Sequence, residues 1–158
     1  MAGIYDDQTY EPRKGVGHLL NRVRTEMLAA VDRELAADAQ LAARGVTSAQ
    51  FIILANLGFG AVKSASELCK GISYDAGAMT RMIDRLEDKG LIRRKRCPND
   101  RRLVYLELTE EGVAALPRMR AVSIQVLNRF LTGFTKTEAR QLEGFLMRML
   151  QNAPVHVD

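Results

Sequence analysis

The sequence predicts a mainly α-helical protein with one small β-hairpin. Apolar residues recur at three- and four-residue spacing over most of the chain, which is the period of an amphipathic helix. Only the stretch 91–109 alternates apolar and polar residues, and it does so on both sides of Pro98-Asn99-Asp100, a turn sequence. Because 47% of the 158 residues are hydrophobic, we expect one ordered domain, 1–158, with flexible ends at about 1–12 and 152–158.

The first predicted helix is long and amphipathic, from about Lys14 to Ala39. Charged residues such as Arg24 and Asp32 fall between its apolar positions. Those apolar positions are Leu20, Val23, Met27, Ala30, Val31 and Leu35. A linker that ends at Gly45 is expected to separate this helix from the next.

Two capping boxes predict the starts of the next two helices. Thr47 with Gln50 opens a helix that is apolar on nearly every face, so we expect it to be buried. Ser64 with Glu67 opens a helix of one to two turns, which Gly71 closes.

A further helix follows after a short polar turn. Asp75 is its predicted cap, and Gly90 ends it. Met79, Ile83 and Leu86 share its apolar face, so that charged residues lie on the other side. Two short helices joined by a tight turn are typical of a helix-turn-helix, and the second would be the reading helix. The hairpin that follows would be a wing.

Positive charge is concentrated in this part of the chain. From Arg81 to Arg102 the sequence has nine Lys or Arg against four Asp or Glu, whereas the remaining residues carry 14 basic and 15 acidic groups. A local basic patch of this kind predicts a phosphate-binding surface. The alternative is that the charges only protect a hairpin edge from aggregation, which would not explain the basic reading helix beside them.

The stretch "ELCKGISYDAGAMTRMIDRLEDKGLIRRKRCPNDRRLVYLELTEEG" resembles the winged helix-turn-helix of the MarR family of bacterial transcription regulators. The residues that carry the resemblance are "TRMIDRLEDKGLI", the "DRR" of the wing and "LTEEG" at the start of the next helix. The resemblance implies a winged helix-turn-helix at about 47–109, flanked by dimerisation helices at about 14–40 and 110–150. It also implies a repressor that leaves a palindromic operator when a small aromatic or phenolic effector binds.

The terminal helices independently need a partner. Thr135 and Glu138 form a capping box, and the helix behind them places apolar residues on one stripe. A lone chain has little to cover this stripe or that of the first helix, so we expect a two-fold homodimer. Pro117 predicts a kink or a late start in the helix between.

We expect contacts to double-stranded DNA from the reading helix, the turn before it and the wing. Small residues at the start of the helix allow close approach to phosphate, and Thr80 and Arg81 are the best candidates for base contacts. The resemblance places Arg101 and Arg102 in a minor groove, with Asp100 directing one of them. An alternative for Arg85 is an ion pair within the helix, with Asp88 or near Asp84. The complete set is Ser73, Tyr74, Ala76, Gly77, Thr80, Arg81, Arg85, Arg94, Arg96, Asp100, Arg101 and Arg102.

The resemblance also implies an effector site between the dimerisation helices and the DNA-binding part. His18, Arg22, Met27 and Phe51 are its candidate walls, although apolar residues there are more often plain core.

Other functions are predicted less well. A cysteine-based redox regulator of the same fold is the main alternative: Cys97 lies among cations that would lower its pKa, whereas Cys69 is expected to be a packing thiol. An enzyme or interaction module is remote, because the sequence shows no catalytic residues, no metal site and no cofactor motif. The N-terminus is acidic where a signal peptide is basic, and "FIILANLGFGAV" is too short to span a bilayer, so we expect a cytoplasmic protein without membrane contact.

Overall fold

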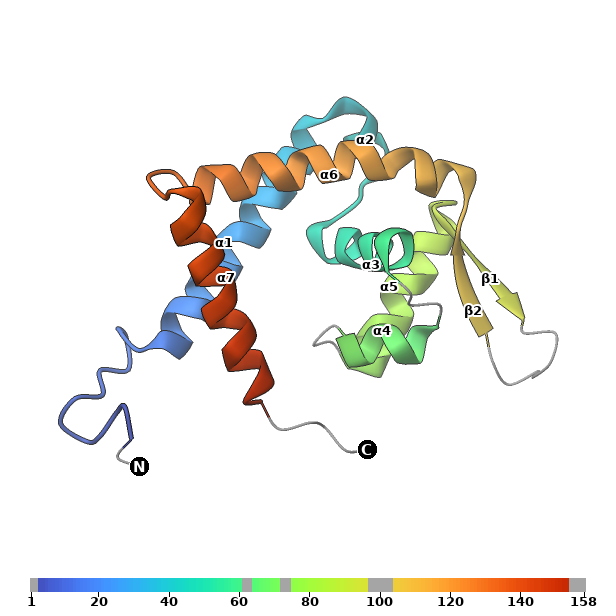
Figure 1. The fold of residues 1–158 in the computed structure, drawn as a ribbon. Helices are drawn as coiled ribbons and strands as arrows, with labels where there is room; N and C mark the ends of the chain where they lie inside the picture. The colour runs from blue at the N-terminus through green and yellow to red at the C-terminus, as the bar shows by residue number, and fades with distance from the viewer. Residues whose placement is uncertain (1–2, 61–63, 72–74, 97–103, 154–158) are drawn as a thin grey trace.

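The computed structural model describes residues 3–60, 64–71, 75–96 and 104–153 (Figure 1). The elements in chain order are α1 Val16–Ala37, α2 Ala39–Arg44, α3 Ser48–Phe59, α4 Ala65–Gly71, α5 Ala76–Asp88, β1 Ile92–Arg96, β2 Val104–Leu108, α6 Glu110–Phe130 and α7 Lys136–Gln151. In Figure 1, α6 runs across the upper part of the molecule, below α2. The end of α6 that follows β2 lies beside the β-hairpin and above α3, and the other end lies beside α1 and α7. The mainly helical fold with a small two-stranded sheet is therefore confirmed.

The predicted helix starts are confirmed by their hydrogen bonds. Thr47 Oγ1 accepts from Gln50 N at 3.3 Å, and Gln50 Oε1 accepts in return from Thr47 N at 3.3 Å. The same reciprocal geometry joins Thr135 and Glu138 at the start of α7. Asp75 Oδ1 accepts from Ala78 N at 2.8 Å. Each cap satisfies an N–H group that the first helical turn leaves without a partner.

The structure differs from the sequence expectations in two details. The predicted linker before Gly45 contains the short helix α2, because Asp38 accepts from the N–H groups of Gln40 and Leu41 and caps it. Of the two alternatives predicted at Pro117, a kink or a late start, the late start does not occur, since α6 begins at Glu110 behind a Thr109 cap and includes Pro117. A proline here removes a hydrogen bond to the Val113 carbonyl. Val113 is exposed, so water can take that place.

The core lies under α6, where residues of α3, α4, α5 and the β-hairpin pack against it. Met79, Ile83 and Leu86 of α5 are fully buried there, as their shared face predicted. They pack in one cluster with Ile53 and Leu54 of α3. This packing fixes which side of α5 faces outward. In the described part of the chain, no helix is long and apolar enough to cross a membrane.

Gly112, in the first turn of α6, lies against the backbone that leaves α5. A Cβ at this position would be 2.1 Å from the carbonyl oxygen of Leu91, and a backbone atom cannot move aside as a side chain can. We therefore expect Gly112→Ala to destabilise the protein by about 1–3 kcal/mol, as overpacking of a core does. Urea unfolding followed by circular dichroism measures this. The control is Gly17→Ala in α1, where a Cβ meets nothing within 4 Å, and an equal response of the two variants would contradict the prediction.

Candidate nucleic-acid interface

The outward side of α5 carries the predicted reading residues. Ala76, Gly77, Thr80, Arg81 and Arg85 are exposed on it. A Cβ on Gly77 would lie 3.4 Å from Arg81 Nη1, so the glycine leaves room for the guanidinium beside the first turn. Thr80 Oγ1 donates to the Ala76 carbonyl at 2.8 Å, which leaves the hydroxyl oxygen free to accept a hydrogen bond.

The start of α5 is less open to phosphate than the small residues suggested. The Asp75 carboxylate already accepts from the Ala78 N–H, and this hydrogen bond is the main cause that lowers the pKa of Asp75. Arg81 contributes to the same lowering through its charge. A phosphate approaching this turn would therefore meet a carboxylate as well as the Arg81 cation.

Two cations of α5 have no ion-pair partner among the described residues. Arg81 and Arg85 both lie on the side opposite Ile83, and neither forms a salt bridge in the described part of the chain. The intrahelical ion pair considered for Arg85 is not formed: no salt bridge joins Arg85 to Asp88 among the described residues, and Asp84 instead binds Arg94 from β1. Both arginines remain available to an external anion.

Arg94 holds the wing, the β1–β2 hairpin, against α5. Its guanidinium contacts the carboxylates of Asp84 and Glu87, and its backbone N–H donates to Glu87 at 3.2 Å. The bond to Asp84 is the largest cause that raises the pKa of Arg94, so the side chain stays charged. These contacts hold β1 beside α5. The DNA contact predicted for Arg94 stays a prediction, although its charge is already paired with these two acids.

The other wing cations divide between the two faces of the hairpin, as strand alternation predicted. Arg93 pairs with Glu107 at 2.9 Å, and Lys95 contacts the same carboxylate at 3.1 Å. The hydrogen bond from Arg93, followed by the one from Lys95, lowers the pKa of Glu107. Arg96 stands opposite Val104, on the same face as Arg94, and has no ion pair among the described residues. Arg96 is therefore the described wing cation most able to meet a phosphate.

Several predicted contacts lie outside the described residues. They are Ser73, Tyr74, Asp100, Arg101 and Arg102, together with Cys97. These positions stay predictions.

The sequence matches the MarR family at residues 46–104. The multiple antibiotic resistance protein MarR of Escherichia coli is 39% identical over 106 residues, which are 66% of this chain and 74% of that protein. The chain belongs to the MarR family. It is therefore a transcription regulator of the MarR type, with the winged helix-turn-helix that the sequence predicted.

Two solved structures show the arrangement of this MarR fold. A cysteine mutant of MarR from E. coli, complexed with operator DNA, has a TM-score of 0.74 at 30% identity. The match covers 85% of this chain and 93% of the mutant's chain. BpsR from Bordetella bronchiseptica, whose DNA binding is regulated by 6-hydroxynicotinic acid, has a TM-score of 0.74 at 27% identity. The match covers 92% of this chain and 99% of the BpsR chain.

In this MarR-family chain, the predicted effector walls come together only in part. Met27 and Phe51 line an apolar hollow of about 160 Å³ between α1, α3 and α6. His18 and Arg22 do not line it, because they lie one or more helical turns earlier on α1. Phe51 also faces an adjoining hollow of about 410 Å³, where Arg120 is the cation.

Arg120 is a residue that the sequence reasoning missed. Its guanidinium lies 5.8 Å from the ring centroid of Phe59, and it shares the hollow with Phe51 and Ser123. On α6 it stands three residues before Ser123, so helical spacing could have placed them together. Nothing in the sequence indicated that α6 passes α3 at this point.

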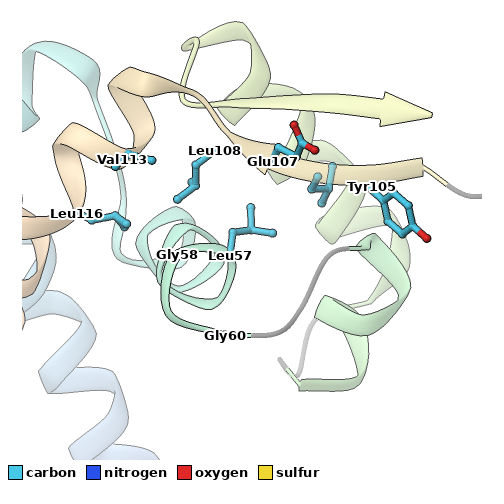
Figure 2. A pocket seen from close by; sticks show the side chains of 9 residues that line it. Leu57, Gly58, Gly60, Tyr105, Glu107, Leu108, Val113 and Leu116 are labelled. Atoms are coloured by element: carbon cyan, nitrogen blue, oxygen red, sulfur yellow. The ribbon is translucent and has the colours of Figure 1, made fainter. Parts of the chain in front are cut away.

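Figure 2 shows a third hollow, open to solvent at the base of the wing, of about 560 Å³, between the end of α3, β2 and the start of α6. Leu57, Leu108 and Leu116 are among its walls, and no predicted site residue in the described part of the chain lines it. A Cβ on Gly58 would lie 2.4 Å from Leu116 Cδ1, so the glycine allows α3 and α6 to approach. The carboxylate of Glu107, which also lines the hollow, is held by Arg93 and Lys95.

Proposed function

We propose that the protein is a cytoplasmic, non-enzymatic repressor that binds a palindromic operator as a homodimer and is released by a small aromatic or phenolic effector. The observation that carries this proposal is the set of unpaired cations on α5 and β1. Arg94 fixes β1 beside α5, so Arg81, Arg85 and Arg96 can act together on one duplex. A reading helix in the major groove and a basic wing on the neighbouring backbone fit this arrangement.

The dimer is supported by helices that bury little within one chain. α7 buries none of its residues, although Leu142, Phe145 and Met149 form a stripe on it. The first turns of α1 likewise expose Val16 and Leu19. Helices of this kind gain most of their stability from packing, so a second copy is the natural cover. A two-fold dimer would present two reading helices to a palindrome.

The test of this function is selection of DNA by the purified protein. Random duplexes retained by the protein should converge on an inverted repeat whose half-sites are about one helical turn apart. Binding of the repeat should exceed that of shuffled DNA by about 10³-fold or more at physiological salt. Recovery of sequences without a repeat would overturn the proposal.

Arg96→Ala should flatten the salt dependence of DNA binding. If Arg96 neutralises a phosphate, its loss lowers the slope of log K against log salt by about 0.9. The control is Arg93→Ala on the same strand, because the charge of Arg93 is already paired with Glu107 and is not expected to meet a phosphate. In that variant Glu107 keeps Lys95 as its partner. Anisotropy titrations at several salt concentrations measure both variants. Equal slopes in the two variants would show that the face of the hairpin that carries Arg96 does not face the phosphates.

The effector site is proposed at the hollow of Phe51 and Arg120. An aromatic carboxylate could stack by Phe51 and pair with the guanidinium, as Arg does with carboxylates. We expect 6-hydroxynicotinate or benzoate to release operator DNA, and Arg120→Ala to raise the concentration needed by about 10-fold or more. Arg24→Ala, which removes an exposed cation from α1, is the control. Release that is unaffected by Arg120→Ala would place the effector elsewhere.

Redox sensing remains the second candidate. Cys69 is half-buried and packs against the core, which favours a packing thiol. Peroxide release that is lost in a Cys69→Ser, Cys97→Ser double variant would establish the redox function instead.

A further inference from the structure

The first turn of α3 contains an unusual concentration of buried polar groups. Ser48 is 5% exposed and Gln50 is 3% exposed, and among the described residues these two are the buried polar side chains. A polar group removed from water is costly unless it is hydrogen-bonded. The two buried side chains find hydrogen-bond partners outside α3: Asp32 of α1 binds Ser48, and Lys89, the residue after α5, binds Gln50.

On one side, Asp32 of α1 holds Ser48. Its Oδ1 accepts from the Ser48 backbone N–H at 2.6 Å, and its Oδ2 accepts from the Ser48 hydroxyl at 2.9 Å. A carboxylate bound twice at a helix N-terminus is a charge-assisted contact of fixed geometry. The long first helix is thus fastened to α3.

On the other side, Lys89 at the end of α5 holds Gln50. Lys89 Nζ donates to Gln50 Oε1 at 2.8 Å and also to the carbonyl oxygen of Gly45. Gln50 Oε1 in addition accepts from Thr47 N in the capping box. Lys89 is half-buried, and burial, followed by the charge of Arg85, lowers its pKa. A lysine with two acceptors in this setting fixes the end of α5 to the α2–α3 junction.

These contacts form one path from the dimerisation helix to the reading helix. α3 packs on both α1 and α5, and in Figure 1 it lies between them. The two ties, Asp32–Ser48 and Gln50–Lys89, both meet in the first turn of α3. The direction of α5 relative to α1, and hence to the two-fold axis, depends on this turn.

We propose that Lys89 is a positioning residue that sets the separation of the two reading helices, and thereby the half-site spacing that the dimer accepts. The proposal rests on the proposed function as a dimeric operator-binding protein, but assigns a role to a residue that need not touch DNA. One base pair inserted between half-sites moves them apart by about 3.4 Å and rotates them by about 34°. A dimer whose reading helices are held rigidly by the Lys89 contacts should bind such a misspaced operator weakly, whereas a dimer without these contacts should bind it more nearly as well as the correct one.

The experiment compares the operator recovered by selection with versions that have one base pair more or fewer at the centre. Lys89→Met keeps the length of the side chain but removes both hydrogen bonds, and Lys89→Arg keeps the charge and donors. Lys14→Met is the charge control, because Lys14 is 76% exposed and pairs only with Glu11 among the described residues. Circular dichroism and light scattering establish that each variant is a folded dimer.

We expect the affinity ratio of correct to misspaced operator to fall at least about threefold in Lys89→Met, and to be retained in Lys89→Arg and Lys14→Met. A purely stabilising role would lower the unfolding temperature of Lys89→Met without changing this ratio. Asp32→Ala loosens the other end of the path at an exposed residue and should lower the ratio as well. It keeps the test open if Lys89→Met does not fold.

An unchanged ratio in folded Lys89→Met, or in Asp32→Ala where Lys89→Met is unfolded, would overturn the positioning role. Failure of the wild type to prefer any inverted repeat would instead reject the proposed function. The two failures are therefore distinguishable.

Discussion

Leu142→Asp is expected to convert the dimer to a monomer and to remove operator binding at nanomolar protein concentrations. Leu142 belongs to the exposed stripe on α7, where it is 38% exposed in one chain. In the proposed dimer this side chain would be covered, and a carboxylate there would lose its hydration without gaining a partner. The effect on DNA is large because two linked reading helices bind about 10²–10⁴ times more tightly than one.

Light scattering and anisotropy on the same samples measure the two parts of this prediction. The control is Gln151→Asp, which introduces the same charge nine residues later, on the opposite side of α7. Gln151→Asp should remain dimeric and bind DNA as the wild type does. A Leu142→Asp protein that still scatters as a dimer would show that the exposed stripe serves another surface.

The local patterns of the sequence predicted the helices and their starts well. Thr47, Asp75 and Thr135 each cap a helix, because a cap needs only residues a few positions away. The buried face of α5 was equally readable from its spacing. α2 was missed although Asp38, three residues before Leu41, is a cap signal of the same kind.

The site was less predictable because its contacts join distant segments. From the sequence, Arg94 was interpreted as a free cation, because nothing in the sequence indicated that the hairpin places it against Asp84 and Glu87. Lys89 likewise looked like one more basic residue, but it reaches Gly45 and Gln50, more than thirty-five positions earlier. Charge composition cannot tell a cation used inside the protein from one left for DNA.

That distinction makes Arg81 the most informative residue on the reading helix. Arg81 is exposed beside Gly77, has no ion pair among the described residues, and lies on the side of α5 away from the core. Arginine in the major groove can donate two hydrogen bonds to guanine, whereas a phosphate contact carries no base information. Arg81→Ala should therefore weaken binding of the preferred operator more than binding of random DNA.

The expected loss for Arg81→Ala is about 1–3 kcal/mol on the preferred operator, which is about 5- to 150-fold in affinity, with a smaller loss on random DNA. Anisotropy titrations of both DNA types at several salt concentrations measure it. Arg33→Ala removes an exposed cation from α1 and should leave both affinities within about twofold of the wild type. Because the wing arginines Arg101 and Arg102 are predicted to position the protein, their alanine variants should weaken both DNA types alike. If Arg81→Ala also weakened both equally, Arg81 would be a phosphate contact, and base reading would have to come from Thr80 or from the turn before α5.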